Sequence, residues 1–138
     1  MRYLPNQSDL PLSPAVLAQP ASNPPLRSLS IRVVGLPWKC TVRPDPSLLH
    51  ENAVVTVLDV LVCLYFHFRT AVKADEYNSM SKAKKREIFH TFERRVGSDP
   101  TQRGKGLRRV DFLDGHTIAQ GLVRTQQSKE DVWDIVVR

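Results

Sequence analysis

The chain has 138 residues, of which 41% are hydrophobic and 25% charged, and its formal net charge is +6 at pH 7. This length predicts a single domain that can bury a core of its own. Two cysteines, Cys40 and Cys63, are too few for a disulfide scaffold and form no CxxC pair, so we expect free thiols in an intracellular protein.

Two observations argue against a membrane or secreted protein. The most apolar run, residues 53–68, is too short to cross a bilayer comfortably and contains Asp59 and His67. The first twelve residues hold no run of seven apolar residues, so we expect no signal peptide. We therefore expect a cytoplasmic or nuclear protein without membrane contact.

Residues 1–27 contain six of the ten prolines and are predicted to form an arm without helix or central strand. We expect a disordered tip and a remainder that is partly docked, because several leucines accompany the prolines. Residues 28–138 are predicted to form the single α+β domain.

The domain is predicted to begin with a β-hairpin. Leu29–Val34 alternates apolar and polar residues, and Trp38–Arg43 does so again after a turn at residues 35–37.

A central helix is predicted next. Thr56 and Asp59 have the spacing of a capping box, and the apolar run after them predicts a helix that ends near Phe68 or Arg69. The predicted core face of this helix comprises Val57, Leu61, Leu64 and Phe68. The predicted solvent-facing stripe comprises Asp59, Cys63 and His67. Val62 and Phe66 border that stripe and are candidates for an interaction patch.

A short turn of helix is predicted at residues 74–80, and the second helix of the domain at Lys82–Val96. Ser81 is expected to cap the longer helix and Gly97 to end it. The apolar stripe of that helix comprises Ile88, Phe89, Phe92 and Val96.

The last third is predicted to be mostly β-structure. Residues 97–106 read as a basic loop, Leu107–Leu113 as a strand, and Asp114-Gly115 as a hairpin turn. Two more strands are predicted at His116–Val123 and Asp131–Val137, with Trp133, Ile135 and Val137 pointing inward. Strands at both ends and helices between them predict an α+β fold. We expect an antiparallel sheet of about five strands, in chain order ββααβββ, with two helices packed on one face.

Several short motifs occur in a recognisable order. They are Pro37-Trp38, Thr41-Val42, the run at residues 56–61, Glu76-Tyr77, the run at 92–95, the run at 106–113, Gly115-x-Thr117, Gly121-Leu122 and Trp133. In this order the chain resembles a domain family of unknown function from basidiomycete fungi, over roughly residues 10–137. The resemblance implies a small α+β domain inside the cell and no established activity.

The stripe of Asp59, Cys63 and His67 has the residue types of an activated thiolate or a zinc site. Asp59 already has a capping role, however, and the stripe is where this helix is expected to meet water. We therefore predict no catalytic residue, no metal and no cofactor.

A polar pocket between the sheet and the helices is a second hypothesis. Its candidate residues are Arg69, Tyr77, Arg95, Arg109 and Asp111. An Arg–Asp pair on a sheet is most often structural, and the functional alternative is an arginine that binds an anion.

A basic patch is the third feature, because residues 80–110 hold ten Lys and Arg against three acidic residues, a local net charge of +7. Its candidates are Lys82, Lys84, Lys85, Arg86, Arg94, Arg103, Lys105 and Arg108. Nucleic-acid binding would explain the charge, but aromatic residues for base stacking are not interleaved with it.

Taken together, the sequence favours a non-enzymatic domain that binds another protein or itself, for example as a homodimer. A small enzyme or ligand-binding protein with a pocket between sheet and helices is the first alternative. Nucleic-acid binding through residues 82–109 is the second.

Overall fold

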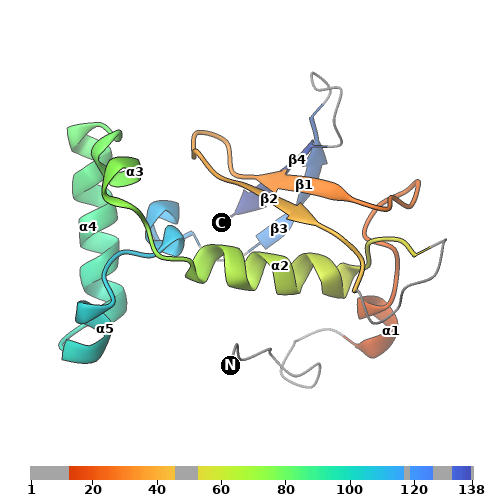
Figure 1. Ribbon diagram of the computed structural model, residues 1–138, viewed down its shortest axis with the longest axis horizontal. Coiled ribbons are helices and arrows are strands. Elements are labelled where there is room, and N and C mark those ends of the chain that lie inside the picture. The colour runs from red at the N-terminus through yellow and green to blue at the C-terminus, as the bar shows by residue number, and fades with distance from the viewer. Residues whose placement is uncertain (1–12, 46–52, 117–118, 126–131, 138) are drawn as a thin grey trace.

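The structure is a computed structural model that describes residues 13–45, 53–116, 119–125 and 132–137. Over these ranges the chain forms a four-stranded mixed sheet, five α-helices and one 3-10 helix (Figure 1). The α+β class is confirmed.

The predicted hairpin is also confirmed. β1 (Leu29–Arg32) pairs antiparallel with β2 (Lys39–Val42), and Ile31 lies opposite Cys40. Both residues belong to the buried face of the sheet.

The remainder of the sheet differs from the prediction of about five antiparallel strands. β4 (Val132–Val137) lies parallel to β1, and β3 (Ala119–Arg124) pairs antiparallel with β4. The strand order is β2-β1-β4-β3, with four strands in the described part of the chain. β4 therefore lies between β3, with which it is antiparallel, and β1, with which it is parallel.

Helix α2 (Val57–Arg69) confirms the central helix and its cap. The Thr56 hydroxyl accepts a hydrogen bond from the backbone N–H of Asp59, and the Asp59 carboxylate accepts one from the backbone N–H of Thr56. These two bonds satisfy amide groups of the first helical turn, which an uncapped helix would leave without partners.

The main core lies between α2 and one face of the sheet. Its buried members are Leu29, Ile31, Cys40, Val42, Val55, Val60, Leu64 and Ile135. On α2 itself only Val60 and Leu64 are fully buried, while Val57 and Leu61 are half-buried. The buried face of α2 is therefore rotated about the helix axis relative to the predicted one, because the sheet covers the side that also carries Cys63.

Cys40 and Cys63 form a disulfide that joins β2 to α2 across this core. The prediction of free thiols is wrong in the structure. The pair was not recognisable in the sequence because Cys63 was assigned to the solvent-facing side of its helix.

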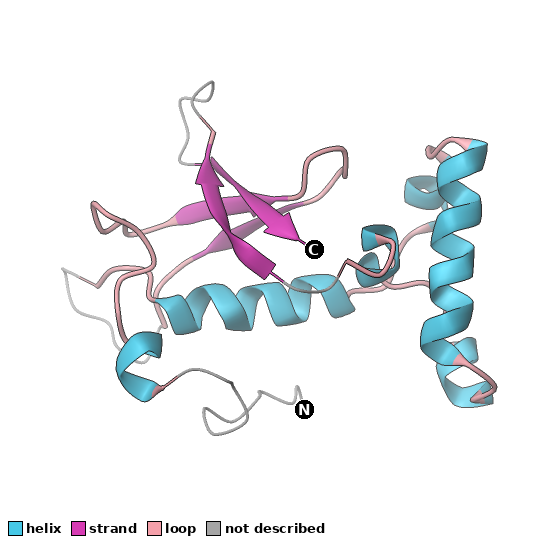
Figure 2. Ribbon diagram, turned by 180° about the vertical axis from the view of Figure 1, so that it is seen from behind, coloured by secondary structure: helices cyan, strands magenta, loops and turns pink. Residues whose placement is uncertain are grey.

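A second group of helices follows α2. It comprises α3 (Ala74–Asn78), α4 (Lys82–Val96), α5 (Pro100–Gly104) and the 3-10 helix η3 (Arg109–Leu113). Figures 1 and 2 show α4 standing crosswise beyond the C-terminal end of α2, with η3 between them. Only α2 lies along the sheet, so the expectation that two helices pack on one face is wrong.

A smaller core holds this helical group to the hairpin. Trp38, which directly precedes β2, packs with Ile88 of α4 and Phe112 of η3. The rings of Trp38 and Phe112 meet edge to face at 4.7 Å between centroids. The hairpin thus contributes residues to both cores.

The strand expected at residues 107–113 is instead an extended segment followed by η3. Asp114 and Gly115 then take positive φ values of 53° and 80°, which form a turn but no hairpin. The basic loop expected at residues 97–106 contains α5, whose N-cap Asp99 accepts hydrogen bonds from two backbone amides.

The proline-rich arm also contains a helix, contrary to expectation. In α1 (Pro14–Leu17), Pro14 occupies the first helical turn, where its missing N–H is tolerated, and Ser13 caps the helix. Leu17 is buried, and backbone hydrogen bonds join Gln19 to Val57 and Ala21 to Val55. The predicted disordered tip lies outside the described residues, and the boundary at residue 27 stays a prediction.

Candidate functional site

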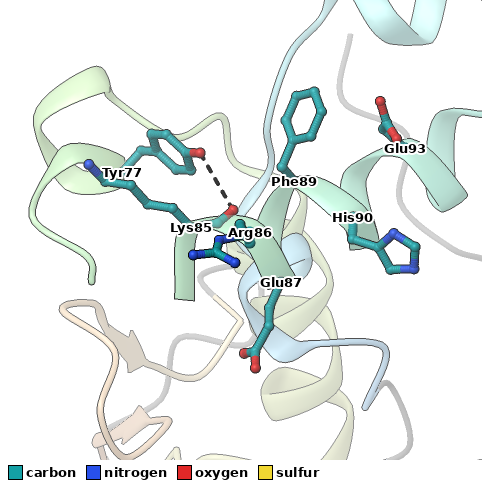
Figure 3. A pocket seen from close by; sticks show the side chains of 7 residues that line it. All are labelled: Tyr77, Lys85, Arg86, Glu87, Phe89, His90 and Glu93. Atoms are coloured by element: carbon teal, nitrogen blue, oxygen red, sulfur yellow. Dashed lines mark hydrogen bonds between the residues drawn. The ribbon is translucent and has the colours of Figure 1, made fainter. Parts of the chain in front are cut away.

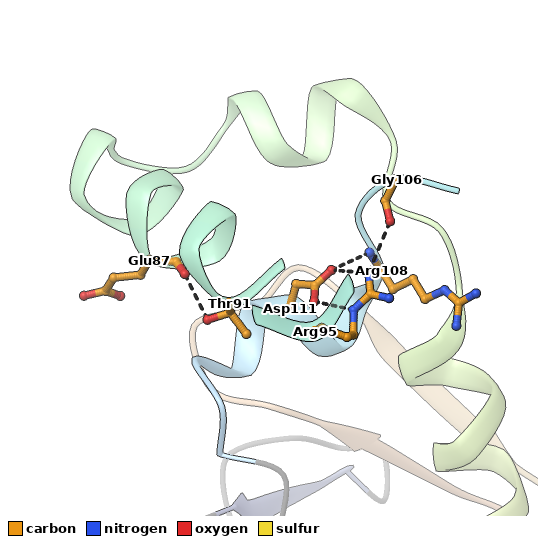
Figure 4. Close-up of polar contacts among 6 residues, drawn as sticks. All are labelled: Glu87, Thr91, Arg95, Gly106, Arg108 and Asp111. Atoms are coloured by element: carbon orange, nitrogen blue, oxygen red, sulfur yellow. Dashed lines mark hydrogen bonds and ion pairs between the residues drawn. The ribbon is translucent and has the colours of Figure 1, made fainter. Parts of the chain in front are cut away.

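Asp111 is completely buried, and both of its carboxylate oxygens accept hydrogen bonds (Figure 4). Its two carboxylate oxygens accept hydrogen bonds from Arg95 Nε at 2.7 Å and Arg95 Nη2 at 2.9 Å. One of them also accepts from the backbone N–H of Arg108 at 2.9 Å, and Arg95 additionally donates to the carbonyl of Gly106. The pair holds η3 against α4. It therefore has a structural role, which is the commonest role of an Arg–Asp pair.

Arg109 lies in a different environment. Its Nη1 is 3.0 Å from His67 Nδ1, and its guanidinium lies 5.0 Å from the ring centroid of Trp38. Burial first, and then the charge of Arg109, lower the pKa of His67 to about 4. His67 is therefore neutral at pH 7 and accepts the hydrogen bond at Nδ1.

Glu76 extends this network from α3. Its carboxylate accepts hydrogen bonds from the indole N–H of Trp38 and from the backbone N–H of Lys73. The Lys73 amide and then the Trp38 indole hold the pKa of Glu76 below its usual range. The network joins α2, α3, the hairpin and η3 by polar contacts around Trp38.

The five candidates for a polar pocket make separate contacts. Arg95 and Asp111 meet, whereas Arg109 turns to His67. The guanidinium of Arg69 lies 5.0 Å from the ring centroid of Tyr65. The hydroxyl of Tyr77 points to the backbone carbonyl of Lys85 at 3.5 Å.

The stripe of Asp59, Cys63 and His67 does not form a chemical triad. Asp59 caps α2, Cys63 is in the disulfide, and His67 contacts Arg109. Within the ranges that the structure describes, no group of three His, Cys, Asp or Glu side chains is placed to hold a metal ion.

The basic patch divides into exposed and partnered side chains. The exposed members are Lys82, Arg86, Arg94, Arg103 and Lys105. Of these, Arg103 also has partners, because it donates to the carbonyl of Gly97 at 2.9 Å and lies 3.9 Å from the carboxylate of Glu93. Lys84 is partnered, since its Nζ donates to Asp114 at 2.8 Å and to the carbonyl of Phe112 at 3.0 Å. The ammonium of Lys85 lies 5.6 Å from the ring centroid of Tyr77, and Arg108 is half-buried.

An open hollow of about 640 Å³ lies between α3 and α4 (Figure 3). We call it the aromatic hollow, and its lining residues are Tyr77, Lys85, Arg86, Glu87, Phe89, His90 and Glu93. Phe89 is 48% exposed there, although it was predicted to lie in the core. The buried positions of α4 are Ile88, Phe92 and Val96, which are spaced four apart and leave Phe89 to one side.

Other apolar side chains meet solvent elsewhere. Val62 and Phe66, the patch candidates on α2, are half-buried, and the ring of Phe66 packs 5.3 Å from that of Tyr65 between centroids. On the two outermost strands at one side of the sheet, Val123 is 57% exposed and Val136 is 40% exposed. The two valines were not singled out from the sequence, since alternation alone cannot say which face of a sheet is covered.

Comparison with known protein families identifies the family of this chain. A model of a family of unknown function, DUF6699, matches residues 1–131. The chain belongs to this family. The match confirms the resemblance to a family of unknown function. Neither the curated proteins nor the solved structures contain a match to this DUF6699 chain.

The described helices of this DUF6699 chain include none that is both long and apolar enough to span a bilayer. Sequence reasoning missed three residues of its polar network, namely Trp38, Glu76 and His67 in its role as an acceptor. Glu76-Tyr77 and Pro37-Trp38 were noted as motifs, but nothing in a single sequence indicates that they face each other.

Proposed function

We propose that the chain is a non-enzymatic protein-interaction domain and that the aromatic hollow binds an apolar anchor residue of a partner protein. The observation that carries the proposal is Phe89, a large aromatic side chain that is half-exposed beside Tyr77 on a rigid helix. Placed in the core, such a ring would contribute about 1.5–3 kcal/mol by burial. In the isolated chain Phe89 is 48% exposed, so much of this free energy is not gained.

The composition of the hollow fits the anatomy of a protein interface. Binding energy concentrates in aromatic residues near the centre of an interface, while polar residues form the rim. Here two aromatic side chains are surrounded by charged ones, including Arg86 and Glu93. An aliphatic or aromatic side chain of a partner would fill the centre.

The charge around the hollow favours an acidic partner over a second copy of the chain. Glu87 and Glu93 offset Lys85 and Arg86 in the lining itself. The excess of positive charge comes from the flanking, exposed Lys82 and Arg94 of α4 and from the whole chain, which carries +6. Two copies that met through this face would bring like charges together, whereas an acidic segment would be attracted.

A small-ligand site is the second candidate, and the size of the hollow favours it. A volume of about 640 Å³ lies within the range of sites that hold small molecules. The hollow is open, however, and a small ligand would stay largely in contact with water. We therefore rank this function below protein binding.

The test uses a panel of acidic peptides, each with one Phe, Leu or Trp, measured by fluorescence anisotropy with the full-length chain. We expect binding by the wild type and at least a tenfold loss in Phe89→Ser. Val123→Ser is the matched control, since it removes an exposed apolar side chain from β3, and it should bind like the wild type. Equal binding by Phe89→Ser and the wild type, or no binding to any peptide, would contradict the proposal.

Light scattering and nucleic-acid titration separate the other hypotheses. A dimer that Phe89→Ser converts to a monomer would assign the hollow to self-association. Tight binding of RNA or DNA that weakens steeply with salt would favour the basic patch. Val62 and Phe66 remain the alternative patch if Phe89 has no effect.

A source in basidiomycete fungi belongs to this proposal, and so does a cytoplasmic or nuclear location on the condition that Cys40 and Cys63 are reduced in the cell. The order of the sequence motifs supports the source. The disulfide Cys40–Cys63 argues against a reducing compartment, where such bonds are rare. Alkylation of the protein directly in lysed cells would decide between the two states of these cysteines.

A further inference from the structure

Four arginines gather where the C-terminal end of α2 meets η3. They are Arg69, Arg95, Arg108 and Arg109. Two backbone contacts bring these segments together, a β-bridge between Ala71 and Arg108 and a hydrogen bond from the Arg109 amide to the Thr70 carbonyl at 3.0 Å. In the sequence, the helices α3, α4 and α5 lie between the two segments.

Among the described residues, the one carboxylate buried at this junction is that of Asp111, and it already has partners. It accepts two hydrogen bonds from the Arg95 guanidinium and one from the Arg108 backbone. In Figure 4 the side chain of Arg108 extends away from Asp111. For the described residues, no hydrogen bond or ion pair reaches the guanidinium groups of Arg69 and Arg108.

This arrangement leaves positive charge uncompensated at a half-buried position. Burial first, and then the charges of Arg69 and Arg95, lower the pKa of Arg108, while Asp111 and Tyr65 oppose the shift. The carbonyl end of α2 provides about half of one negative charge, which is less than the two unpaired guanidinium groups carry. Like charges that are held together in this way destabilise a fold unless something neutralises them.

The ring of Tyr65 supports the guanidinium of Arg69 at 5.0 Å, which restricts its orientation. Guanidinium groups bind phosphate oxygens through paired, parallel N–H bonds, and a half-buried site strengthens such bonds. At this junction the exposed guanidinium of Arg69 is held against Tyr65, Arg108 is half-buried, and the positive charge of both is not neutralised, which favours binding of an oxyanion.

We propose that Arg69 and Arg108 bind an oxyanion of the phosphate class, either as a free ion or as a phosphorylated side chain of a partner. The site would neutralise the charge at the junction of α2 and η3 and hold the two segments together. It uses none of the residues that line the aromatic hollow, so the two proposals can fail independently.

Thermal unfolding in inorganic phosphate, with chloride at matched ionic strength as reference, tests the site. We expect the Tm of the wild type to rise with phosphate concentration, because a ligand that binds only the folded state stabilises it. In Arg108→Gln the rise should be lost. Arg43→Gln removes the same charge from an exposed position just after β2, and it should respond like the wild type.

A second readout separates an anion site from a purely structural role of Arg108. Without phosphate, Arg108→Gln should be at least as stable as the wild type, since the substitution removes like-charge repulsion. A phosphate effect that persists in Arg108→Gln, an equal effect of chloride, or a loss of stability in Arg108→Gln without phosphate would each overturn the proposal.

Calorimetric titration identifies the source of the anion. A phosphoserine peptide that binds at least tenfold more tightly than inorganic phosphate would support a phosphorylated partner. Equal affinities would support a free anion, and absence of binding by both would contradict the site.

Discussion

The guanidinium of Arg95 binds the buried carboxylate of Asp111 through two hydrogen bonds of 2.7 and 2.9 Å. This pair connects α4 to η3 across 16 residues of sequence. Around it the helical group, the end of α2 and the smaller core come together.

Replacing Asp111 with Ala should destabilise the chain by about 3–5 kcal/mol, because the partly buried guanidinium of Arg95 and the Arg108 amide would lose their acceptor. Urea unfolding followed by circular dichroism measures the change. Asp75→Ala, an exposed carboxylate of α3, is the control and should change stability by less than about 1 kcal/mol. Similar losses in the two variants would contradict the structural role of Asp111.

Two phenylalanines of α4 should respond differently to truncation. Phe92 is 8% exposed, and Phe92→Ala should cost about 3–5 kcal/mol in unfolding free energy. Phe89 is 48% exposed, and Phe89→Ala should cost less than about 1 kcal/mol. Chemical denaturation of both variants checks the orientation of α4. A larger loss in Phe89→Ala would restore the orientation first predicted from the sequence.

Reduction of the disulfide should lower stability measurably. Cys40 and Cys63 are 23 residues apart, and closing a loop of that length in the unfolded chain is worth about 3 kcal/mol. We expect a lower midpoint of urea unfolding with reductant, and no effect of reductant on the Cys40→Ser/Cys63→Ser double variant. Complete alkylation of both thiols without prior reduction would show that the bond is absent.

Acid should destabilise the fold through His67. The pKa of His67 is lowered from 6.5 to about 4, so between these values the unfolded chain binds a proton that the folded chain excludes. Stability from this group is therefore complete above about pH 6.5 and declines as the pH falls towards 4.

Thermal unfolding between pH 4 and 7 measures the effect, which we expect to reach roughly 1–2 kcal/mol once solvent screening of this half-buried group is considered. His67→Gln keeps an acceptor for Arg109 but does not titrate, and it should show a shallower pH dependence. An unchanged pH profile in this variant would mean that His67 is not the titrating group.

Local signals predicted the ends of the two longest helices, α2 and α4, but missed the short helices α1 and α5. Thr56 with Asp59, and Ser81 with Gly97, mark the ends of α2 and α4 in the sequence and perform these roles in the structure. Capping depends on residues within one turn, so it is readable without knowledge of the tertiary fold. The orientation of α2 was not readable, since Cys63 faces inward only because β2 lies there.

The segment Leu107–Leu113 shows the opposite case. Its alternation of apolar and polar residues mimics a strand, but Asp111 is turned inward by Arg95, a partner from another helix. Arg109 was assigned to a strand face for the same reason, whereas it lies on η3 and contacts His67 of α2. Contacts that join residues far apart in sequence decided both outcomes.

The parallel pairing of β1 with β4 has a kinetic consequence. Arg32 and Asp134, which meet across these strands, are separated by 102 residues. On a ribosome, the hairpin therefore waits with one open edge until nearly the whole domain has been synthesised. Such high contact order slows folding and exposes a pairing edge to neighbouring chains. Helix α2 is synthesised long before β4, so it can pack on the hairpin until β4 is available.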